Sequence, residues 1–208
     1  AREWSPSNRI MVEEFTRGPQ LSTESIIADG VAHTIGISDR NYEFLETYAP
    51  HIVENGGDLP STLSDTEVDS ARDIIQAVAN AFGMKNGIIK GDIVIHENRA
   101  QVIEVALRLS GGYFCTYEIP LNTGASTVIP TAKLALGLPV TAEELAPKYQ
   151  RHVIQRYIFP SPGHVQSVMG VSEAASLAGV AYTEVWSKPG DRISKPENAS
   201  GSAGVVMT

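Results

Sequence analysis

Two carboxylates and one arginine stand inside apolar runs of the sequence. Asp92 lies in "GDIVI", Glu104 lies in "VIEVA", and Arg108 follows four residues later. Carboxylate oxygens suit a hard divalent cation such as Mg²⁺, which usually completes its shell with phosphate oxygens. An arginine beside such a cation suits a phosphate or a developing oxyanion, because its guanidinium keeps its charge and donates through a planar fork. These three residues therefore predict a site for a metal ion and a phosphate.

The distance between the two carboxylates depends on a hairpin that residues 87–96 and 100–109 predict. A two-residue turn at 98–99 would put the carboxylates on opposite faces of the hairpin. A three-residue loop over 97–99 would instead place them directly across from each other. Like charges at that spacing are destabilising unless a cation lies between them. The metal site thus requires the three-residue loop.

Each of these residues also has an ordinary structural interpretation. Asp92 and Glu104 would be solvated carboxylates on the polar face of a half-exposed strand. Arg108 has the same strand parity as Glu104 and would form an ion pair with it. Residues 110–112 (Ser-Gly-Gly) end the strand and would let bare backbone amides approach a ligand.

The segment "VEEFTRGPQLSTES" presents a second pair of adjacent carboxylates. Glu13 and Glu14 on one strand must point to opposite faces, so one of them faces inward or into a cleft. A strand that offers backbone C=O and N–H groups to a planar base would use Glu13 and Thr16. The alternative is an exposed edge strand with ordinary surface charges.

The elements that position these residues follow from hydrophobic spacing and turn signals. A capping box at Ser64 and Glu67 begins a helix whose apolar residues repeat to Phe82. A second helix is predicted over 128–136, with Pro130 in its first turn, and a short helix in the connector that follows. Strands are predicted at 10–15, 21–27, 31–38, 87–96 and 100–109, and short β-like runs alternate with turns over 151–208. This order favours an α+β fold, an antiparallel sheet with helices on one face, with a boundary near 139.

Composition excludes several classes of protein. The chain has 208 residues, a net charge of −8 and no cluster of basic residues, so nucleic acid and anionic membranes are poor partners. No apolar run is long enough to span a bilayer. The lone Cys115 excludes an intramolecular disulfide framework and a cysteine-based zinc cluster, which favours a cytoplasmic location. Neither a Rossmann fingerprint nor a P-loop is present, so a nucleotide would have to be held in another way.

An ordered set of motifs resembles the ATP-grasp superfamily. The set is "VEEFTRGPQLSTES", "IVENGGDLPS", the 67–83 helix, "KGDIVI", "VIEVALRLSGG" and "TAKLALGLPV", and it covers roughly residues 10–139. The chain looks most like the carboxylate–amine ligases and is similar also to biotin carboxylase and the large subunit of carbamoyl phosphate synthetase. The resemblance implies the C-terminal lobe of an ATP-grasp domain over 1–139, an antiparallel sheet with helices. A small β-rich C-terminal module would follow over 140–208.

The resemblance assigns nucleotide-binding roles to several residues. The adenine would bind at the hinge formed by Glu13, Glu14, Phe15 and Thr16. Gln20 stands where the family usually has a glutamate for the ribose hydroxyls, so the contact there would lack the charge. His51 and Glu54 lie near a segment that lines the site in relatives.

The resemblance also implies the metal and the catalytic arginine. Asp92 and Glu104 match the acidic pair that binds Mg²⁺ bridging the ATP phosphates, with Mn²⁺ as an alternative metal. Ala106 stands where many members have a metal-binding asparagine, so a second metal would have fewer protein ligands. Arg108 matches the arginine associated with the acyl phosphate or the substrate carboxylate.

The resemblance finally implies what the chain does and what it works with. Residues 1–84 contain no lysine, and no glycine-rich phosphate loop precedes Val12. We therefore expect a fragment of an ATP-dependent carboxylate–amine or carboxylate–thiol ligase that forms an acyl phosphate from Mg-ATP. Its partners would be small-molecule carboxylate and amine substrates, the N-terminal half of the same enzyme, and a second copy in a homodimer. The alternative is a non-catalytic binding or assembly fragment derived from the ATP-grasp fold.

Overall fold

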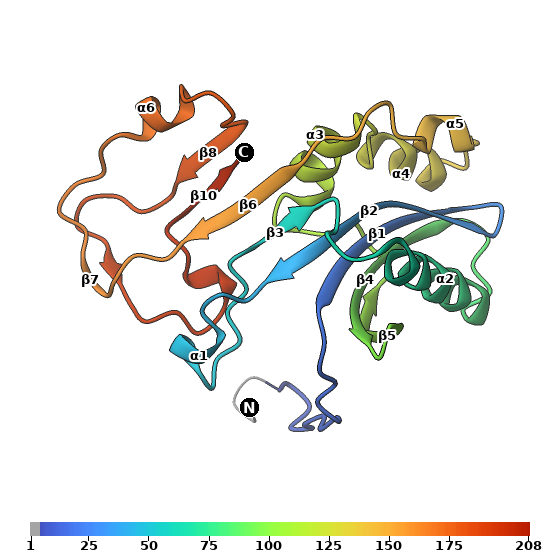
Figure 1. Ribbon diagram of the computed structural model, residues 1–208, viewed down its shortest axis with the longest axis horizontal. Helices are drawn as coiled ribbons and strands as arrows, with labels where there is room; N and C mark the ends of the chain where they lie inside the picture. Colours follow the sequence, from blue (N-terminus) through green and yellow to red (C-terminus); the bar gives the residue numbers. More distant parts are fainter. Residues whose placement is uncertain (1–4) are drawn as a thin grey trace.

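A single antiparallel sheet organises the chain in the computed structural model, which describes residues 5–208 (Figure 1). Its eight strands lie in the order β5-β4-β1-β2-β3-β6-β10-β8. Their bounds are β1 Gln20–Ala28, β2 Val31–Asn41, β3 Gly56–Leu59, β4 Gly87–His96, β5 Arg99–Ala106, β6 Val153–Ile158, β8 Tyr182–Val185 and β10 Gly204–Met207. A separate two-stranded ribbon pairs β7, Gly163–His164, with β9, Arg192–Ile193.

Helices fill the connections between the strands. The longest is α2, Asp65–Ala81, and the predicted capping box between Ser64 and Glu67 begins it. The others are α1 Leu45–Tyr48, η2 Phe114–Glu118 (a π-helix), α3 Ile119–Thr123, α4 Val128–Ala135, α5 Ala142–Leu145, α6 Val171–Ala175 and the 3₁₀ turn η3 Ala199–Gly201. No helix within residues 5–208 is long and apolar enough to cross a membrane.

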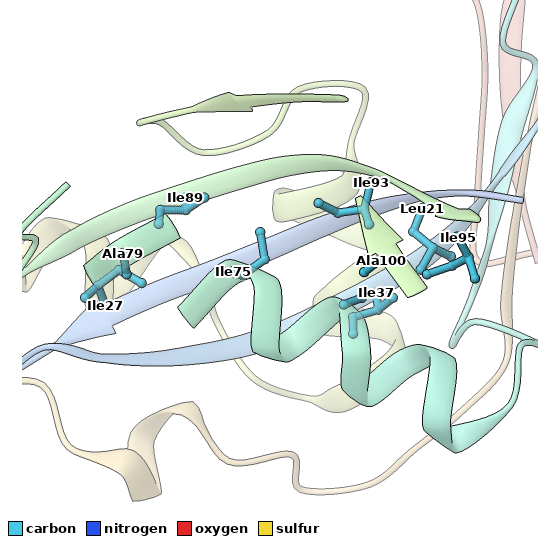
Figure 2. Packing of buried hydrophobic residues seen from close by; sticks show 10 residues of the cluster. Leu21, Ile27, Ile37, Ile75, Ala79, Ile89, Ile93, Ile95 and Ala100 are labelled. Carbon is cyan, nitrogen blue, oxygen red and sulfur yellow. The ribbon is translucent and has the colours of Figure 1, made fainter. Parts of the chain in front are cut away.

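Helix α2 covers one face of the sheet. Figure 2 shows Ile75 and Ala79 of α2 against Ile27 of β1 and Ile89 and Ile93 of β4. The strand residues in this cluster recur at alternate positions, as expected where only one face of a strand meets the helix. Burial of these side chains fixes which face of β1 and β4 points away from α2.

The opposite face of the sheet is covered by η2 and helices α3 to α5 (Figure 1). Ile26 of β1 packs there with Phe114, Ile119 and Leu145. The prediction of helices on one face was therefore wrong, while the predicted α+β fold with an antiparallel sheet is confirmed. The reason is that the short helices after the glycine pair carry their own apolar residues, which close over the second face.

The register of the β4–β5 hairpin brings Asp92 and Glu104 together by a route that the sequence did not predict. The turn is a two-residue one at Glu97-Asn98, both with positive φ, and it pairs His96 with Arg99. A bulge then adds one residue to β5, so that Asp92 lies directly opposite Glu104. The requirement for a three-residue loop was therefore wrong, although the opposition of the two carboxylates is as the metal hypothesis needs.

Other predicted elements agree with the structure except at the N-terminus. The strands at 21–27 and 31–38 and the helix at 128–136 correspond to β1, β2 and α4. Residues 10–15 form no strand, because they are exposed and pair with no other strand within residues 5–208. Strands β6, β10 and β8 of the tail extend the main sheet beside β3. The domain boundary near residue 139 stays a prediction.

The α2 interface provides a direct test of this packing. Ile75 is completely buried, so replacing it with alanine should lower the free energy of unfolding by about 2–5 kcal/mol through the lost contacts and the cavity left behind. Ile129 of α4 is 64 % exposed, and Ile129→Ala is the matched control, expected to change stability by less than about 0.5 kcal/mol. Urea unfolding measures both; equal losses would contradict the burial pattern.

Candidate active site

A cavity of about 260 Å³ opens on the face of the sheet away from α2. Ser22 of β1, Arg40 of β2, Lys90 of β4 and Gln155 of β6 line its floor. Those on β1, β2 and β4 alternate with the isoleucines that face α2, and Gln155 lies two residues after Val153, which packs on the face away from α2. One face of the sheet therefore gathers polar groups from four strands. The segment from Arg108 to Glu118 lies across them and forms the other wall.

Arg40 is the central cation of the floor. Its guanidinium lies 2.5 Å from Glu54 and 3.0 Å from Asp92, and it stacks over the ring of Tyr42. Burial alone would lower the pKa of Arg40, but the hydrogen bond and charge of Glu54 outweigh it and raise the pKa above its ordinary value. Arg40 is therefore a fixed positive charge that two carboxylates hold in place.

Asp92 and Glu104 differ in their surroundings. Asp92 is mostly buried and forms ion pairs with Arg40 and Lys90. Glu104 is exposed, and no ion pair to it, from Arg108 or another residue, is found in the described part of the chain. No group of three or more histidine, cysteine or acidic residues within residues 5–208 forms a metal cluster. Two opposed carboxylates still fit Mg²⁺, which is commonly held by one or two carboxylates together with substrate phosphates.

Arg108 lines the cavity, and its anion-binding role stays a prediction. Its guanidinium donates to the carbonyl oxygen of Leu109 at 2.9 Å, which leaves further N–H groups free for a ligand. Gly111 and Gly112 follow it along the wall. The carbonyl oxygen of Gly112 accepts hydrogen bonds from Gln155 Nε2 at 2.6 Å and from Tyr157 Oη at 3.2 Å, so this segment is tied to β6.

A buried carboxyl, that of Glu24, holds the same segment against the sheet. Glu24 of β1 is 0 % exposed, and its Oε2 accepts hydrogen bonds from both the backbone N–H and the hydroxyl of Ser110. Burial raises the pKa of Glu24, although the hydrogen bonds from Ser110 act in the opposite direction. Glu24 therefore links the central strand to the wall that carries Arg108.

A second buried carboxyl faces the cavity without a partner. Glu118, at the end of η2, is 3 % exposed and lines the cavity. Within residues 5–208 its carboxyl group makes no hydrogen bond or ion pair. The nearby acids Glu54 and Asp58, in contrast, form ion pairs with Arg40 and Arg156. Burial first, and the charges of Glu54 and Asp58 second, raise the pKa of Glu118 to about 8.

The structure brings together only some of the predicted nucleotide-binding residues. Glu54 lines the cavity, and Gln20 lies at the start of β1, where its side-chain oxygen accepts a hydrogen bond from Tyr42 Oη at 3.0 Å. His51 is not among the residues that line the cavity, nor are the predicted hinge residues, which lie in an irregular and largely exposed segment. The nucleotide-binding roles of Glu13, Glu14, Phe15, Thr16, Gln20, His51 and Glu54 remain predictions.

Four residues of the site, Arg40, Lys90, Glu24 and Glu118, were not predicted from the sequence. Arg40 and Lys90 line the cavity, and Glu24 lies buried on the same face of the sheet. Their orientation can be assigned only once the strand register is known. One signal was available for Lys90: it stands two residues before Asp92 in "KGDIVI", so on a strand both side chains point to the same face. Glu118 gave none, because it looks like a surface residue of a short helix.

Comparisons with known proteins agree with this architecture. Residues 156–208 match the family model described as L-amino acid ligase C-terminal domain 2. An uncharacterized protein, y4rH, of Sinorhizobium fredii is 27 % identical over 205 residues, which cover 98 % of this chain and 40 % of that protein.

Two solved structures share this fold over most of the chain. The L-amino acid ligase of Bacillus licheniformis superposes with a TM-score of 0.78 at 20 % identity over 93 % of this chain and 47 % of that one. The biotin carboxylase domain of the Hydrogenobacter thermophilus 2-oxoglutarate carboxylase, solved with MgADP and bicarbonate, gives 0.62 at 15 % identity, over 94 % and 42 %. The chain has the fold of the C-terminal part of an ATP-grasp protein. It spans less than half the length of each of these proteins, so in them this ATP-grasp part is joined to further chain.

The anchor between Glu24 and Ser110 predicts a stability effect. Glu24→Ala removes the acceptor of two buried donors, so we expect a loss of about 1–3 kcal/mol in the free energy of unfolding and faster hydrogen exchange at the Ser110 amide. Glu24→Gln keeps an acceptor oxygen and most of the volume and should lose less. Urea unfolding and amide exchange measure the difference; equal behaviour of the two variants would contradict the anchoring role.

Glu118 predicts a pH dependence of stability. Its pKa rises from 4.5 to about 8 on folding, so the native state binds a proton more tightly, and stability falls as pH rises between these values. Glu118→Gln removes this effect, so the variant should gain on the wild type by on the order of a few kcal/mol between pH 4.5 and 8.5.

The matched control for this pH effect is Glu143→Gln in α5, since Glu143 is exposed. Urea unfolding across that pH range should give a constant difference between Glu143→Gln and the wild type. Glu24, whose pKa is also raised, is present in all three proteins and cancels. A flat difference for Glu118→Gln would show that the Glu118 carboxyl is not perturbed.

Proposed function

We propose that this chain is the C-terminal part of an ATP-dependent carboxylate–amine ligase that works through an acyl phosphate with Mg-ATP. The observation that carries the proposal is the cavity itself. It gathers three cationic side chains, Arg40, Lys90 and Arg108, beside the opposed carboxylates Asp92 and Glu104. Cations with an acidic metal-binding pair suit a transferring phosphoryl group, whose charge must be neutralised.

The residues of this chain have distinct roles in the proposed reaction. A Mg²⁺ ion, or Mn²⁺, held by Asp92 and Glu104 would neutralise the ATP phosphates when bound. Lys90 and Arg108 bind the oxygens of the phosphoryl group as it moves to the carboxylate substrate. The hydrogen bonds between Glu24 and Ser110 fix the segment that carries Arg108 against strand β1.

The chemical class of the substrates is also part of the proposal. The matched family model is named for L-amino acid ligases, and one structural neighbour is an L-amino acid ligase. We infer that both the carboxylate and the amine are amino acids, joined as an amide; a thiol nucleophile is the alternative. We also propose that the N-terminal half of the enzyme is the main partner of this chain, that the enzyme forms a homodimer, and that it is located in the cytoplasm.

A non-catalytic role is the second candidate. Ala106 and Gln20 stand where many ATP-grasp enzymes have charged or metal-binding residues, and residues 10–15 form no hinge strand here. An assembly fragment would bind no nucleotide even in the full-length protein. Isothermal titration with Mg-ATP separates the two functions: binding by the full-length protein together with ATP turnover supports the ligase, and absence of both supports the assembly role.

Glu104 tests the ligase mechanism directly. Glu104→Gln in the full-length protein removes one metal carboxylate from an exposed strand position, so we expect ADP formation to fall by about 100-fold or more while circular dichroism and urea unfolding stay unchanged. Gln101→Ala, on an exposed position of the same strand, is the control that should retain activity. Turnover at the wild-type rate in Glu104→Gln would remove Glu104 from the mechanism.

A further inference from the structure

The charges around Glu118 do not balance. Three acidic residues stand close together, Glu54, Asp58 and Glu118. Arg40 lies 2.5 Å from Glu54, and Arg156 binds both oxygens of Asp58 at 3.0 and 3.1 Å. Within residues 5–208 no third cation is paired with Glu118, so the cluster lacks one positive charge whenever Glu118 is ionised.

Glu118 is also oriented and enclosed as a binding group. It is only 3 % exposed, yet it lines the cavity together with Gln155 and Tyr157. A carboxyl that is largely removed from water and makes no hydrogen bond within the described residues has an unfavourable desolvation free energy. A carboxyl in this position is stabilised when a ligand supplies the missing donor and charge.

We propose that Glu118 receives the protonated amine of the nucleophilic substrate and takes up its proton. This inference rests on the proposed ligase function and adds to it the residue that prepares the amine. An ammonium group is the complementary ligand because it supplies one positive charge and up to three N–H donors. The same cavity holds Arg108 and Lys90, so a substrate amine at Glu118 lies in the cavity where the phosphoryl chemistry is proposed.

The proton transfer is balanced as follows. The ammonium gives one proton to the Glu118 carboxylate and becomes a neutral amine. The amine nitrogen then forms a bond to the acyl carbon, the bond from that carbon to the phosphate oxygen breaks, and the second amine proton leaves with the inorganic phosphate. Burial favours the neutral carboxyl, so it favours the first step.

The groups that face Glu118 come from several elements. Glu54, just before β3, Asp58 within β3 and Tyr157 of β6 lie close to it. Arg40 of β2 and Arg156 of β6 are the ion-pair partners of Glu54 and Asp58. Burial raises the pKa of Tyr157, and the charge of Glu118 raises it further, so Tyr157 keeps its proton across the neutral range. Glu118 is the group in this set that has no oppositely charged partner and is able to exchange a proton with a ligand.

Binding of the ammonium is testable on this chain without any turnover. The chain is labelled with ¹³C at the glutamate carboxyls, and Glu118 is assigned by its loss in Glu118→Gln. L-alaninamide, which carries an ammonium group, should lower the midpoint of the Glu118 titration by about one pH unit or more, whereas N-acetyl-L-alaninamide, which lacks the charge, should leave it unchanged. No shift with L-alaninamide, or equal shifts with both probes, would overturn the proposal.

The proton-accepting step is testable by turnover in the full-length protein. The twenty common L-amino acids serve as carboxylate donors, and either an amino acid amine or hydroxylamine serves as the nucleophile. Hydroxylamine is largely uncharged at neutral pH and needs no proton acceptor. Glu118→Gln should therefore lower kcat/KM for the amine by about 100-fold or more and leave hydroxamate formation unchanged, while its rate with the amine keeps rising with pH.

The outcomes separate this inference from the ligase proposal. Equal loss with the amine and hydroxylamine would assign Glu118 a merely structural role and overturn the inference. If the wild type forms no ATP-dependent hydroxamate, the ligase function fails, and the L-alaninamide titration still decides whether Glu118 is an ammonium site. Glu143→Gln is the control in both experiments, expected to behave as the wild type.

Discussion

The two-residue period of the strands decides which of their side chains lie on the face of the sheet that carries the cavity. β1 lies within the sheet between β4 and β2, and its alternate residues point either to α2 or to the cavity. The bulge in β5 restores this alternation after the two-residue turn, so that Glu104 faces Asp92. A second bulge in β2, beside Glu24 and Ser25 of β1, sets the phase that directs Arg40 into the cavity. A shift of one residue in either strand would exchange polar and apolar faces.

The wall of the cavity depends on polar contacts made with this fixed floor. Ser110 is held by Glu24 of β1, and the Gly112 carbonyl is held by Gln155 of β6. These contacts are buried or partly buried, so losing one partner leaves the other unsatisfied. Arg108 stands immediately before Ser110, and its position therefore depends on strands in the middle of the sheet. The position of Arg108 and the stability of the fold are thus coupled through this wall.

Local sequence signals identified the elements but could not give their relative placement. The capping box of Ser64 and Glu67 and the apolar period after it specified α2, because helix formation there is decided within a few turns. The partnership of Asp92 and Glu104 depended on a bulge, which spacing does not reveal. The surroundings of Glu118 were not predictable for a related reason: its neighbours Glu54, Asp58 and Tyr157 are distant from it in the sequence. The predicted hinge strand at 10–15 was wrong because local β propensity cannot supply a pairing partner.

The unbalanced carboxyl at Glu118 has a physical logic within such a fold. Burying an unpaired acid lowers stability, so a sequence under selection for stability alone would place an apolar residue or an arginine partner there. The two neighbouring acids do have arginine partners, which shows that the fold accommodates cations at this position. Leaving the third without one creates a site whose missing charge a ligand supplies on binding. The free energy lost in the empty state is then recovered in the complex, and this favours occupancy by a cation over occupancy by a neutral molecule of the same shape.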